Sequence, residues 1–156
     1  MAIEVGQEAP DFTLKDGDNE DVTLSSFRGD KNVVLVFFPL AFSGGCTRQL
    51  TQIGEHEGRY ADDDAQVIGV SVDSRYAQRR FAEELGLRDT ILLADFEPKG
   101  AVSRSYGVYL DGPGTSGRAT FVIDKSGVVR GASVTDTPAE IPDEEEYFRA
   151  LSVCNV

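Results

Sequence analysis

Two uninterrupted apolar runs constrain the fold of this chain most strongly. Residues 32–38, NVVLVFF, and residues 65–72, AQVIGVSV, are rich in Val and Phe and contain no charged side chain. Runs of this kind are typical of β-strands that are covered on both faces, as in parallel sheets. Residues 119–134 predict a hairpin, because two strand-like segments flank a Lys-Ser-Gly turn. The sequence therefore predicts a β-sheet that is covered on both faces.

Helical patterns lie between and after these strands. Residues 47–60 carry a narrow apolar stripe at helical spacing. Ser74 is a suitable N-cap for the segment RYAQRRFAEEL, and Gly86 is a suitable stop. Two further helices are predicted over residues 99–107 and 143–152. Strand, helix, strand, helix, hairpin and closing helix indicate an α/β protein with a thioredoxin-like fold, in which helices flank both faces of a central mixed β-sheet.

Length and charge limit the classes of protein that need to be considered. The 156 residues contain no linker, repeat or low-complexity tract, which predicts a single domain over residues 1–156. No stretch reaches the roughly 18 apolar residues that span a bilayer, and the first residues lack the pattern of a signal peptide. We therefore expect a cytoplasmic protein without a membrane partner. A net charge of -12, with no run of basic residues, argues against nucleic acid as a partner.

Cys46 follows the first apolar run, within the segment PLAFSGGCTRQL at residues 39–50. Pro39 ends the strand because it has no N–H to donate, and Gly44 and Gly45 allow a tight turn into a helix. In the first turn of a helix, unpaired amides and the positive end of the helix dipole stabilise the reactive thiolate. The local pattern leaves two interpretations open, a nucleophile at a helix N-terminus or a buried, inert cysteine.

Other candidate sites in the sequence are weak. His56 is the only histidine, and both cysteines are distant from it in sequence, so we expect no metal site. The segment GPGTSG at residues 112–117 has the glycine spacing of a dinucleotide site, but it runs into a strand-like segment rather than opening a helix. No Cys-x-x-Cys pair occurs, which argues against a disulfide exchanger of the thioredoxin type.

Four separated segments carry a resemblance to a known family. The segment PLAFSGGC is similar to the Pro-x-x-x-Thr/Ser-x-x-Cys signature of peroxiredoxins. The other matches are APDFTL at residues 9–14, LRDTILLADFEPKGAVSRSYGV at residues 87–108 and GRATFVID at residues 117–124. The sequence most resembles the alkyl hydroperoxide reductase E subgroup of the AhpC/TSA family, which usually works with one cysteine. The resemblance covers nearly the whole chain.

The resemblance implies a thiol-dependent peroxidase and a role for each matching residue. Cys46 would attack one peroxide oxygen and become a sulfenic acid. Pro39 would shield the thiolate from water, and Ser43 would offer its hydroxyl to the thiolate and then to the peroxide. Arg118 would bring its guanidinium to both, and backbone amides around Gly45 and Cys46 would complete the substrate pocket. No cofactor is implied.

The resemblance also implies partners for the reaction. The substrate would be hydrogen peroxide, an alkyl hydroperoxide or peroxynitrite. An external thiol of thioredoxin, mycoredoxin or low-molecular-weight type would be the reductant, and the protein would be a homodimer. Cys154 is either a resolving cysteine that forms a disulfide with oxidised Cys46 or a spectator near the end of the chain.

Two residues depart from the usual pattern of the family. Ser43 stands where Thr is common, and Gln49 stands where a glutamate often pairs with arginine. A neutral amide accepts a hydrogen bond but cannot neutralise a guanidinium. These departures keep a second hypothesis open, namely a redox sensor or binding protein in which Cys46 oxidises slowly.

Overall fold

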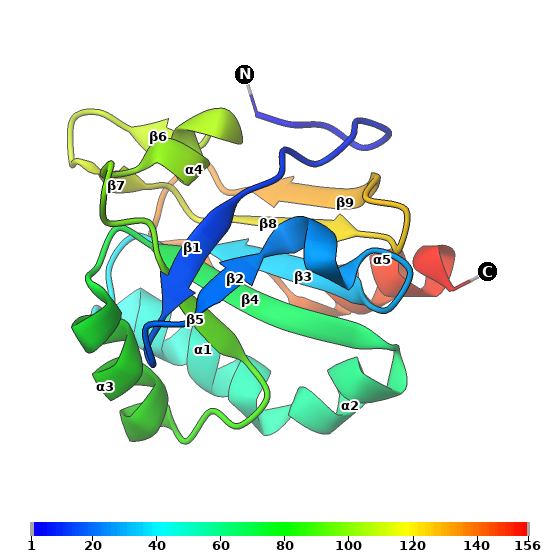
Figure 1. Ribbon diagram of the computed structural model, residues 1–156, viewed down its shortest axis with the longest axis horizontal. Coiled ribbons are helices and arrows are strands. Elements are labelled where there is room, and N and C mark those ends of the chain that lie inside the picture. Colours follow the sequence, from blue (N-terminus) through cyan, green and yellow to red (C-terminus); the bar gives the residue numbers. More distant parts are fainter. Residues whose placement is uncertain (1, 156) are drawn as a thin grey trace.

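A seven-stranded mixed sheet forms the centre of the computed structural model, which describes residues 2–155 (Figure 1). The strand order is β2-β1-β5-β4-β3-β8-β9, in which β3, β4 and β5 are parallel and the other pairings are antiparallel. The strands are β1 (Thr13–Asp16), β2 (Asp21–Thr23), β3 (Asn32–Phe37), β4 (Ala65–Ser71), β5 (Ile91–Ala94), β8 (Ala119–Ile123) and β9 (Val129–Val134). A separate ribbon pairs β6 (Tyr109–Leu110) with β7 (Thr115–Ser116).

Helices cover both faces of the sheet, but unequally. They are α1 (Gly44–Glu55), α2 (Glu57–Asp62), α3 (Arg75–Leu85), α4 (Ala101–Ser105), α5 (Glu144–Cys154) and the short 3-10 helix η1 (Leu24–Phe27). Apolar residues of α1, α2, α3 and α5 form the core on one face, whereas α4, η1 and the N-terminal segment cover the other. The predicted α/β fold of thioredoxin-like type is thereby confirmed. Within residues 2–155, every helix is too short or too polar to cross a bilayer.

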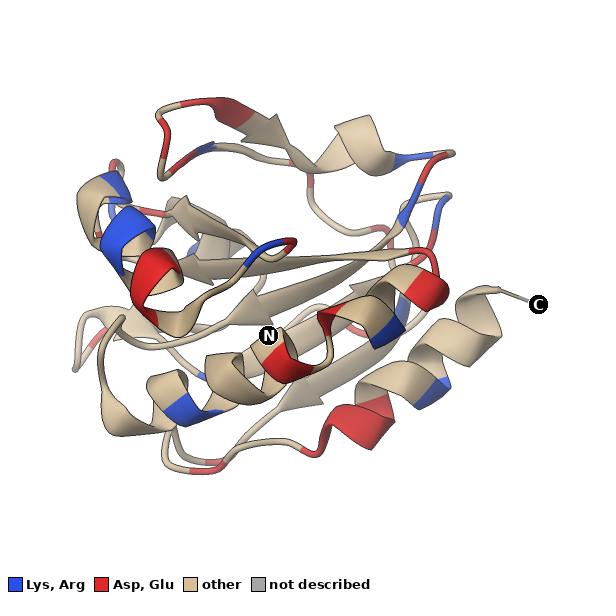
Figure 2. Cartoon of the chain, turned by 90° about the horizontal axis from the view of Figure 1, so that it is seen from below, with Lys and Arg blue, Asp and Glu red and all other residues tan. Residues whose placement is uncertain are grey.

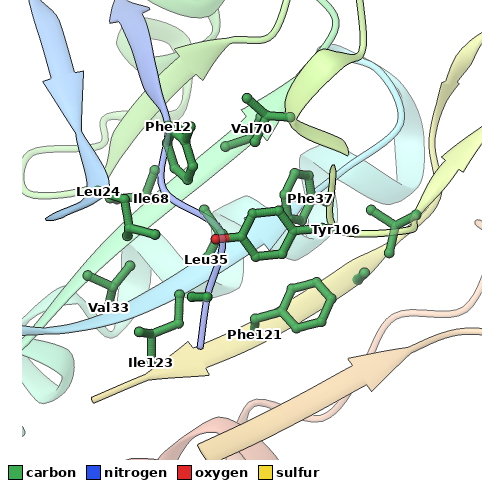
Figure 3. Packing of buried hydrophobic residues seen from close by; sticks show 14 of the residues in the cluster. Phe12, Leu24, Val33, Leu35, Phe37, Ile68, Val70, Tyr106, Phe121 and Ile123 are labelled. Carbon is green, nitrogen blue, oxygen red and sulfur yellow. The ribbon is translucent and has the colours of Figure 1, made fainter. Parts of the chain in front are cut away.

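Strand β3 lies at the centre of the core because both of its faces are covered. All six of its residues are buried. Leu35 and Phe37 point into a cluster with Tyr106 and Phe121 on one face of the sheet (Figure 3). Val36 belongs to the cluster on the other face, which includes the apolar residues of α1. This two-sided burial explains why the strand is an uninterrupted apolar run.

Helix boundaries agree with the sequence where the caps are local. Ser74 caps α3 by accepting a hydrogen bond from the amide of Ala77 at 3.3 Å, and Gly86 ends the helix in the left-handed conformation. The segment predicted as one helix over residues 47–60 is instead two helices, α1 and α2, separated at His56. The last helix also extends further than expected, because Cys154 is its final residue rather than part of a tail.

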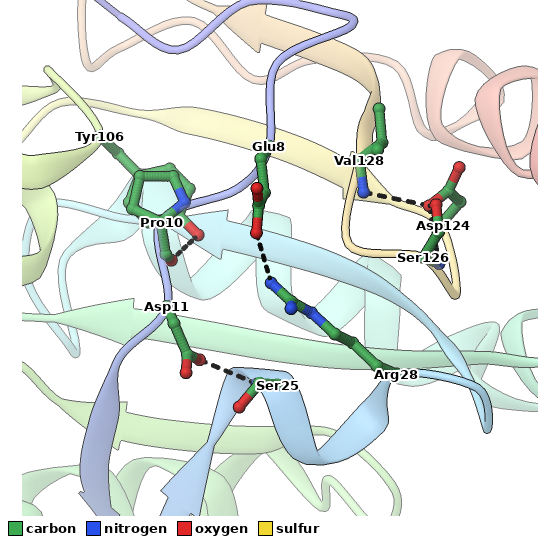
Figure 4. A network of polar contacts seen from close by, with 9 residues as sticks. All are labelled: Glu8, Pro10, Asp11, Ser25, Arg28, Tyr106, Asp124, Ser126 and Val128. Carbon is green, nitrogen blue, oxygen red and sulfur yellow. Dashed lines mark hydrogen bonds and ion pairs between the residues drawn. The ribbon is translucent and has the colours of Figure 1, made fainter.

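Polar contacts fasten the N-terminal segment across the less helical face (Figure 4). The guanidinium of Arg28 donates to Glu8 at 3.1 Å, and the carboxylate of Asp11 accepts from the amide of Ser25 at 2.9 Å. The hydroxyl of Tyr106 donates to the carbonyl of Pro10 at 2.7 Å. These bonds keep the segment over the core cluster of this face.

Strand pairing brings three loops together at one edge of the sheet. Phe37, the last residue of β3, pairs with Ala119, the first residue of the antiparallel β8. Strand β4 runs parallel to β3, with Val70 opposite Phe37. The segment that follows β3, the segment that follows β4 and the segment that precedes β8 therefore meet at this edge, which we call the carboxyl edge of β3.

Candidate active site

Cys46 lies at the carboxyl edge of β3, in the first turn of α1. The chain leaves β3 at Phe37 and enters α1 at Gly44, so that Cys46 is the third residue of the helix. Thr47 is the first residue whose amide bonds back within this turn, to the carbonyl of Ser43 at 2.9 Å. The amides before it belong to the open end of the helix, where backbone N–H groups and the helix dipole favour an anion.

Arg118 reaches Cys46 from the segment that precedes β8. Its Nη2 donates to Cys46 Sγ at 3.5 Å, although the two residues are 72 positions apart. Its Nη1 donates to Gln49 Oε1 at 2.6 Å, and its Nε donates to the carbonyl of Pro138 at 2.9 Å. Three acceptors, two on α1 and one in the segment that follows β9, thus hold the guanidinium in one orientation beside the sulfur.

The guanidinium of Arg118 has no carboxylate partner. Its residue is only 2% exposed, and among residues 2–155 its side chain forms no ion pair within 4.0 Å. Gln49 supplies an oxygen without a negative charge. A buried charge is costly without an opposite charge nearby. The sulfur of Cys46 is one of the three groups that this buried cation contacts.

Ser43 does not direct its hydroxyl at Cys46. The side chain is exposed, and its Oγ donates to the carbonyl of Leu40 at 2.9 Å. The reason is local: Ser43 is the N-cap of α1 with an extended backbone (φ -68°, ψ 154°), and its hydroxyl folds back on the preceding turn. The expected contact with the thiolate is therefore not present in this conformation.

The other expected site residues lie in the same loop. Pro39 is half-buried at the bend that follows β3, and its shielding of the sulfur stays a prediction. Gly45 is half-buried and approaches Arg118 closely, since a Cβ built on it would lie 2.9 Å from Nη2. The structure therefore brings Gly45, Cys46 and Arg118 together.

No sequence pattern points to two further contributors, Pro138 and Tyr147. Pro138 acts through its backbone carbonyl. The hydroxyl of Tyr147 accepts from Gln49 Nε2 at 3.4 Å and from the hydroxyl of Thr120 at 3.0 Å. Burial raises the pKa of Tyr147, and the hydrogen bonds from Thr120 and Gln49 only partly oppose this. Tyr147 is therefore a neutral phenol, and its hydroxyl helps to orient the amide of Gln49.

Cys154 lies at the opposite edge of the sheet from Cys46. The residue after it, Asn155, accepts a hydrogen bond from Nδ2 of Asn32 at 2.9 Å, and Asn32 is the first residue of β3. Six strand residues separate the two edges by roughly 17 Å. Burial, with a smaller contribution from the carboxylate of Asp124, raises the pKa of Cys154 to about 11. A direct bond to Cys46 within one chain would require α5 to unwind, because disulfides join Cα atoms less than about 7 Å apart.

The sulfur itself is enclosed in this conformation. Cys46 is 0% exposed. The loop over residues 135–142 contributes to the cover, since Pro138 lies against Arg118 and Gly45. An oxidant must enter through a small displacement of the covering loops. The site supports nucleophilic attack by the sulfur of Cys46 on an oxidant. The guanidinium of Arg118 lies beside the place where negative charge would develop on the leaving oxygen.

His56 lies outside the site. Its Nδ1 is 3.0 Å from Glu144 Oε1, and its side chain is 48% exposed. In the part of the chain that the structure describes, no three His, Cys, Asp or Glu side chains converge as metal ligands.

Comparison with known proteins supports a family assignment. The chain is 42% identical to the alkyl hydroperoxide reductase E of Mycobacterium tuberculosis over 150 residues, which are 96% of this chain and 97% of that protein. The fold resembles the crystal structure of Enterococcus faecalis AhpC, with a TM-score of 0.86, 27% identity and coverage of 99% of this chain and 93% of that one. Peroxidoxin BcpB of Mycobacterium tuberculosis has a TM-score of 0.83, with 28% identity and coverage of 98% and 97%. A model of the AhpC/TSA family matches residues 5–132, and the chain therefore belongs to the AhpC/TSA family, the peroxiredoxins.

Proposed function

We propose that this protein is a thiol-dependent peroxidase in which Cys46 is the nucleophile. The contact between Cys46 Sγ and the buried guanidinium of Arg118, at a helix N-terminus, is the observation that carries the proposal. The names of the relatives agree with it, since they include alkyl hydroperoxide reductase and thioredoxin-dependent peroxide reductase. Hydrogen peroxide, alkyl hydroperoxides and peroxynitrite are the substrates that such a site would accept.

The reaction transfers one oxygen to sulfur. The thiolate of Cys46 attacks one peroxide oxygen, so that an S–O bond forms while the O–O bond breaks. Sulfur is oxidised to sulfenic acid. The leaving oxygen takes a proton and departs as water or an alcohol, or, when the substrate is peroxynitrite, the leaving group is nitrite. Arg118 stays charged throughout and offers fixed donors to the oxygen that gains charge. Pro39 keeps its expected place beside the sulfur as part of the proposal. The hydroxyl of Ser43 would have to turn away from the carbonyl of Leu40 to take part.

Regeneration requires an external thiol. The position of Cys154 at the far edge of the sheet supports its role as a spectator. The reductant would be a thiol of thioredoxin, mycoredoxin or low-molecular-weight type. The first thiol condenses with the sulfenic acid to a mixed disulfide and releases water, and a second thiol then attacks this disulfide and frees Cys46. Both cysteines are free, which fits the reducing conditions of the cytoplasm, the location that we propose.

Rapid mixing with hydrogen peroxide tests the proposal. We expect Cys46→Ser to abolish peroxide reduction and Arg118→Ala to lower the second-order rate constant roughly a hundredfold or more. Cys154→Ser is the control and should affect recycling at most. After oxidation without reductant, the mass of the protein should show sulfenic or overoxidised Cys46 and no disulfide to Cys154. A rate no greater than that of free cysteine thiolate would instead support the redox sensor.

We also propose that the protein is a homodimer. Four exposed apolar side chains lie in the segments that follow β3, β4 and β5, and we call them the apolar edge patch: Leu40, Phe42, Tyr76 and Phe96, which are 43%, 47%, 69% and 54% exposed. Tyr76 and Phe96 line one groove, and the backbone of the loop that carries Phe42 is bonded to Asp73, three residues before Tyr76. Apolar clusters of this kind are suited to protein contacts.

A further inference from the structure

The loop between β3 and α1 determines where Cys46 lies. It begins at Phe38, whose amide donates to the carbonyl of Val70 on β4 at 3.0 Å. It ends at Phe42 and Ser43, directly before α1. Phe42 has φ +69°, in the left-handed region that bulky residues rarely adopt. Such a conformation is strained, so contacts elsewhere in the fold must maintain it.

The carboxylate of Asp73 supplies one of these contacts. Its Oδ2 accepts a hydrogen bond from the amide of Ala41 at 2.8 Å, and Ala41 directly precedes Phe42. The same oxygen accepts from the hydroxyl of Ser71 at 2.6 Å. Asp73 follows β4, so the parallel pairing of β3 and β4 brings it beside this loop. A charged acceptor strengthens both bonds.

Asp73 is itself held by buried polar groups. The hydroxyl of Ser71, which is 1% exposed, accepts from Nε2 of Gln78 at 2.7 Å. The same Nε2 donates to the carbonyl of Leu93 at 2.8 Å, and Gln78 is completely buried. A continuous chain of hydrogen bonds thus runs from β5 through α3 and β4 to the loop before Cys46. Because the hydroxyl of Ser71 and the amide of Ala41 both donate to the same oxygen, the carboxylate of Asp73 has a fixed orientation.

Phe42 is held from its other side. Its ring lies 4.9 Å from the ring of Phe81 on α3, with an angle of 49° between the planes. Two neighbouring residues of the loop are therefore fixed by different means, Ala41 through its backbone and Phe42 through its ring. Phe81 is 1% exposed and belongs to the core, so the bond to Asp73 is the one that can be removed without opening a cavity there.

We propose that Asp73 is a positioning residue for the reaction of Cys46. It holds the backbone of the loop through Ala41 and thereby sets the start of α1 and the distance from Cys46 to Arg118. Asp73 touches neither the sulfur nor the reacting oxygen. The proposal rests on Cys46 as the nucleophile, and it adds a residue that the sequence pattern around the cysteine does not contain.

The pair Asp73→Ala and Asp73→Asn tests the geometry separately from the charge. Both hydrogen bonds go to one oxygen, so the amide oxygen of Asn accepts both donors, whereas Ala accepts neither. We expect Asp73→Ala to lower the second-order rate constant with hydrogen peroxide by roughly tenfold to a hundredfold, because small displacements of a reacting group cost this much. Asp73→Asn should stay within about threefold of the wild type, since a neutral oxygen still makes both bonds.

Asp124→Ala is the matched control. Asp124 also accepts backbone amides, those of Ser126 and Val128, but it follows β8 at the far edge of the sheet from Arg118. We expect Asp124→Ala to lower the melting temperature and to keep the wild-type rate constant. Ser71→Ala removes one of the bonds that orient Asp73 and should lower the rate less than Asp73→Ala does. It provides the test if Asp73→Ala does not fold.

Each outcome decides between the proposals. A wild-type rate in Asp73→Ala, or in Ser71→Ala when that variant replaces it, would overturn the positioning role. So would an Asp73→Asn variant that is as slow as Asp73→Ala, because then the geometry would not be what matters. Retention of peroxide reduction by Cys46→Ser would overturn the proposed function instead, whatever the result at Asp73.

Discussion

Gly44 and Gly45 begin α1, but only one of them faces the guanidinium of Arg118. A Cβ added at Gly45 would lie 2.9 Å from Arg118 Nη2, whereas one added at Gly44 would lie 3.7 Å from Nη1 of Arg48. The first distance is too short for a normal contact, and three hydrogen bonds prevent Arg118 from moving away freely. The absence of a side chain at Gly45 is therefore what lets the guanidinium approach the helix end.

We expect Gly45→Ala to slow the oxidation of Cys46 by roughly tenfold or more, because the methyl group displaces the guanidinium from the sulfur. Gly44→Ala is the matched control and should keep the wild-type rate. Alanine is the better helix former by about 1 kcal/mol, so a loss of rate would not reflect a weaker helix. Stopped-flow kinetics with hydrogen peroxide measures both variants, and equal rates would contradict the role of Gly45.

At the residue scale, local patterns predict what is local, and the distant Arg118 is found only through the family resemblance. Cys46 could be found because a proline, two glycines and a helical pattern follow one another within residues 39–50. Pro138 could not be found, because it acts through a carbonyl that every residue has. Tyr147 meets Gln49 across 98 positions, a contact that exists only after α5 has packed on the sheet. Ser43 shows the opposite error, since its local bond to Leu40 replaces the expected contact with Cys46.

At the scale of elements, caps and burial explain which predictions succeeded. Helix α3 was predicted residue by residue, because both of its ends are marked by side chains with a capping role. The sequence missed β1, β2 and β5, which are only three or four residues long. Strand β2 is at the edge of the sheet and β1 lies next to it. Both include charged residues and neither contains a fully buried residue, so no apolar run marks them. Their strand character comes from pairing with neighbours.

The turn between β8 and β9 depends on an ionised Asp124 (Figure 4). Burial alone would raise its pKa, but hydrogen bonds from Ser126, Arg130 and the amide of Val128 outweigh burial and lower the pKa to about 2. An unfolded aspartate titrates near pH 3.9. Because the folded value is the lower one, Asp124 stabilises the fold fully above about pH 4, and this contribution is lost as the pH falls towards 2.

Asp124→Asn should therefore lower the free energy of unfolding by about 2 kcal/mol at pH 7 and by much less at about pH 2. Urea unfolding at the two pH values measures the difference. Asp111→Asn is the control, since that carboxylate is 84% exposed and pairs only with Arg104 at the surface. We expect it to change the free energy of unfolding little at either pH. If Asp124→Asn lowers the free energy of unfolding equally at both pH values, the hydrogen bonds that Asp124 accepts stabilise the fold without a contribution from its charge.

At the scale of the whole molecule, net charge and exposed apolar surface have opposite effects on the association of two chains. The chain has 27 acidic and 15 basic residues, and both signs are spread over the helical face, with acidic residues gathered at the start of α5 (Figure 2). Two chains of charge -12 repel each other at long range. The apolar edge patch favours association at short range. Salt screens the repulsion and leaves the apolar contact in place.

The proposed homodimer should therefore tighten as salt is added. We expect the dissociation constant, measured by analytical ultracentrifugation, to fall when the ionic strength rises from about 0.01 M to about 0.15 M, where the Debye length shortens from about 30 Å to about 8 Å. Phe96→Glu places a charge in the apolar edge patch and should yield monomers. Val153→Glu adds the same charge at a residue that is 58% exposed at the opposite edge of the sheet, and it should leave the dimer intact. If Val153→Glu dissociates the protein and Phe96→Glu does not, the interface lies on the side of α5, away from Cys46.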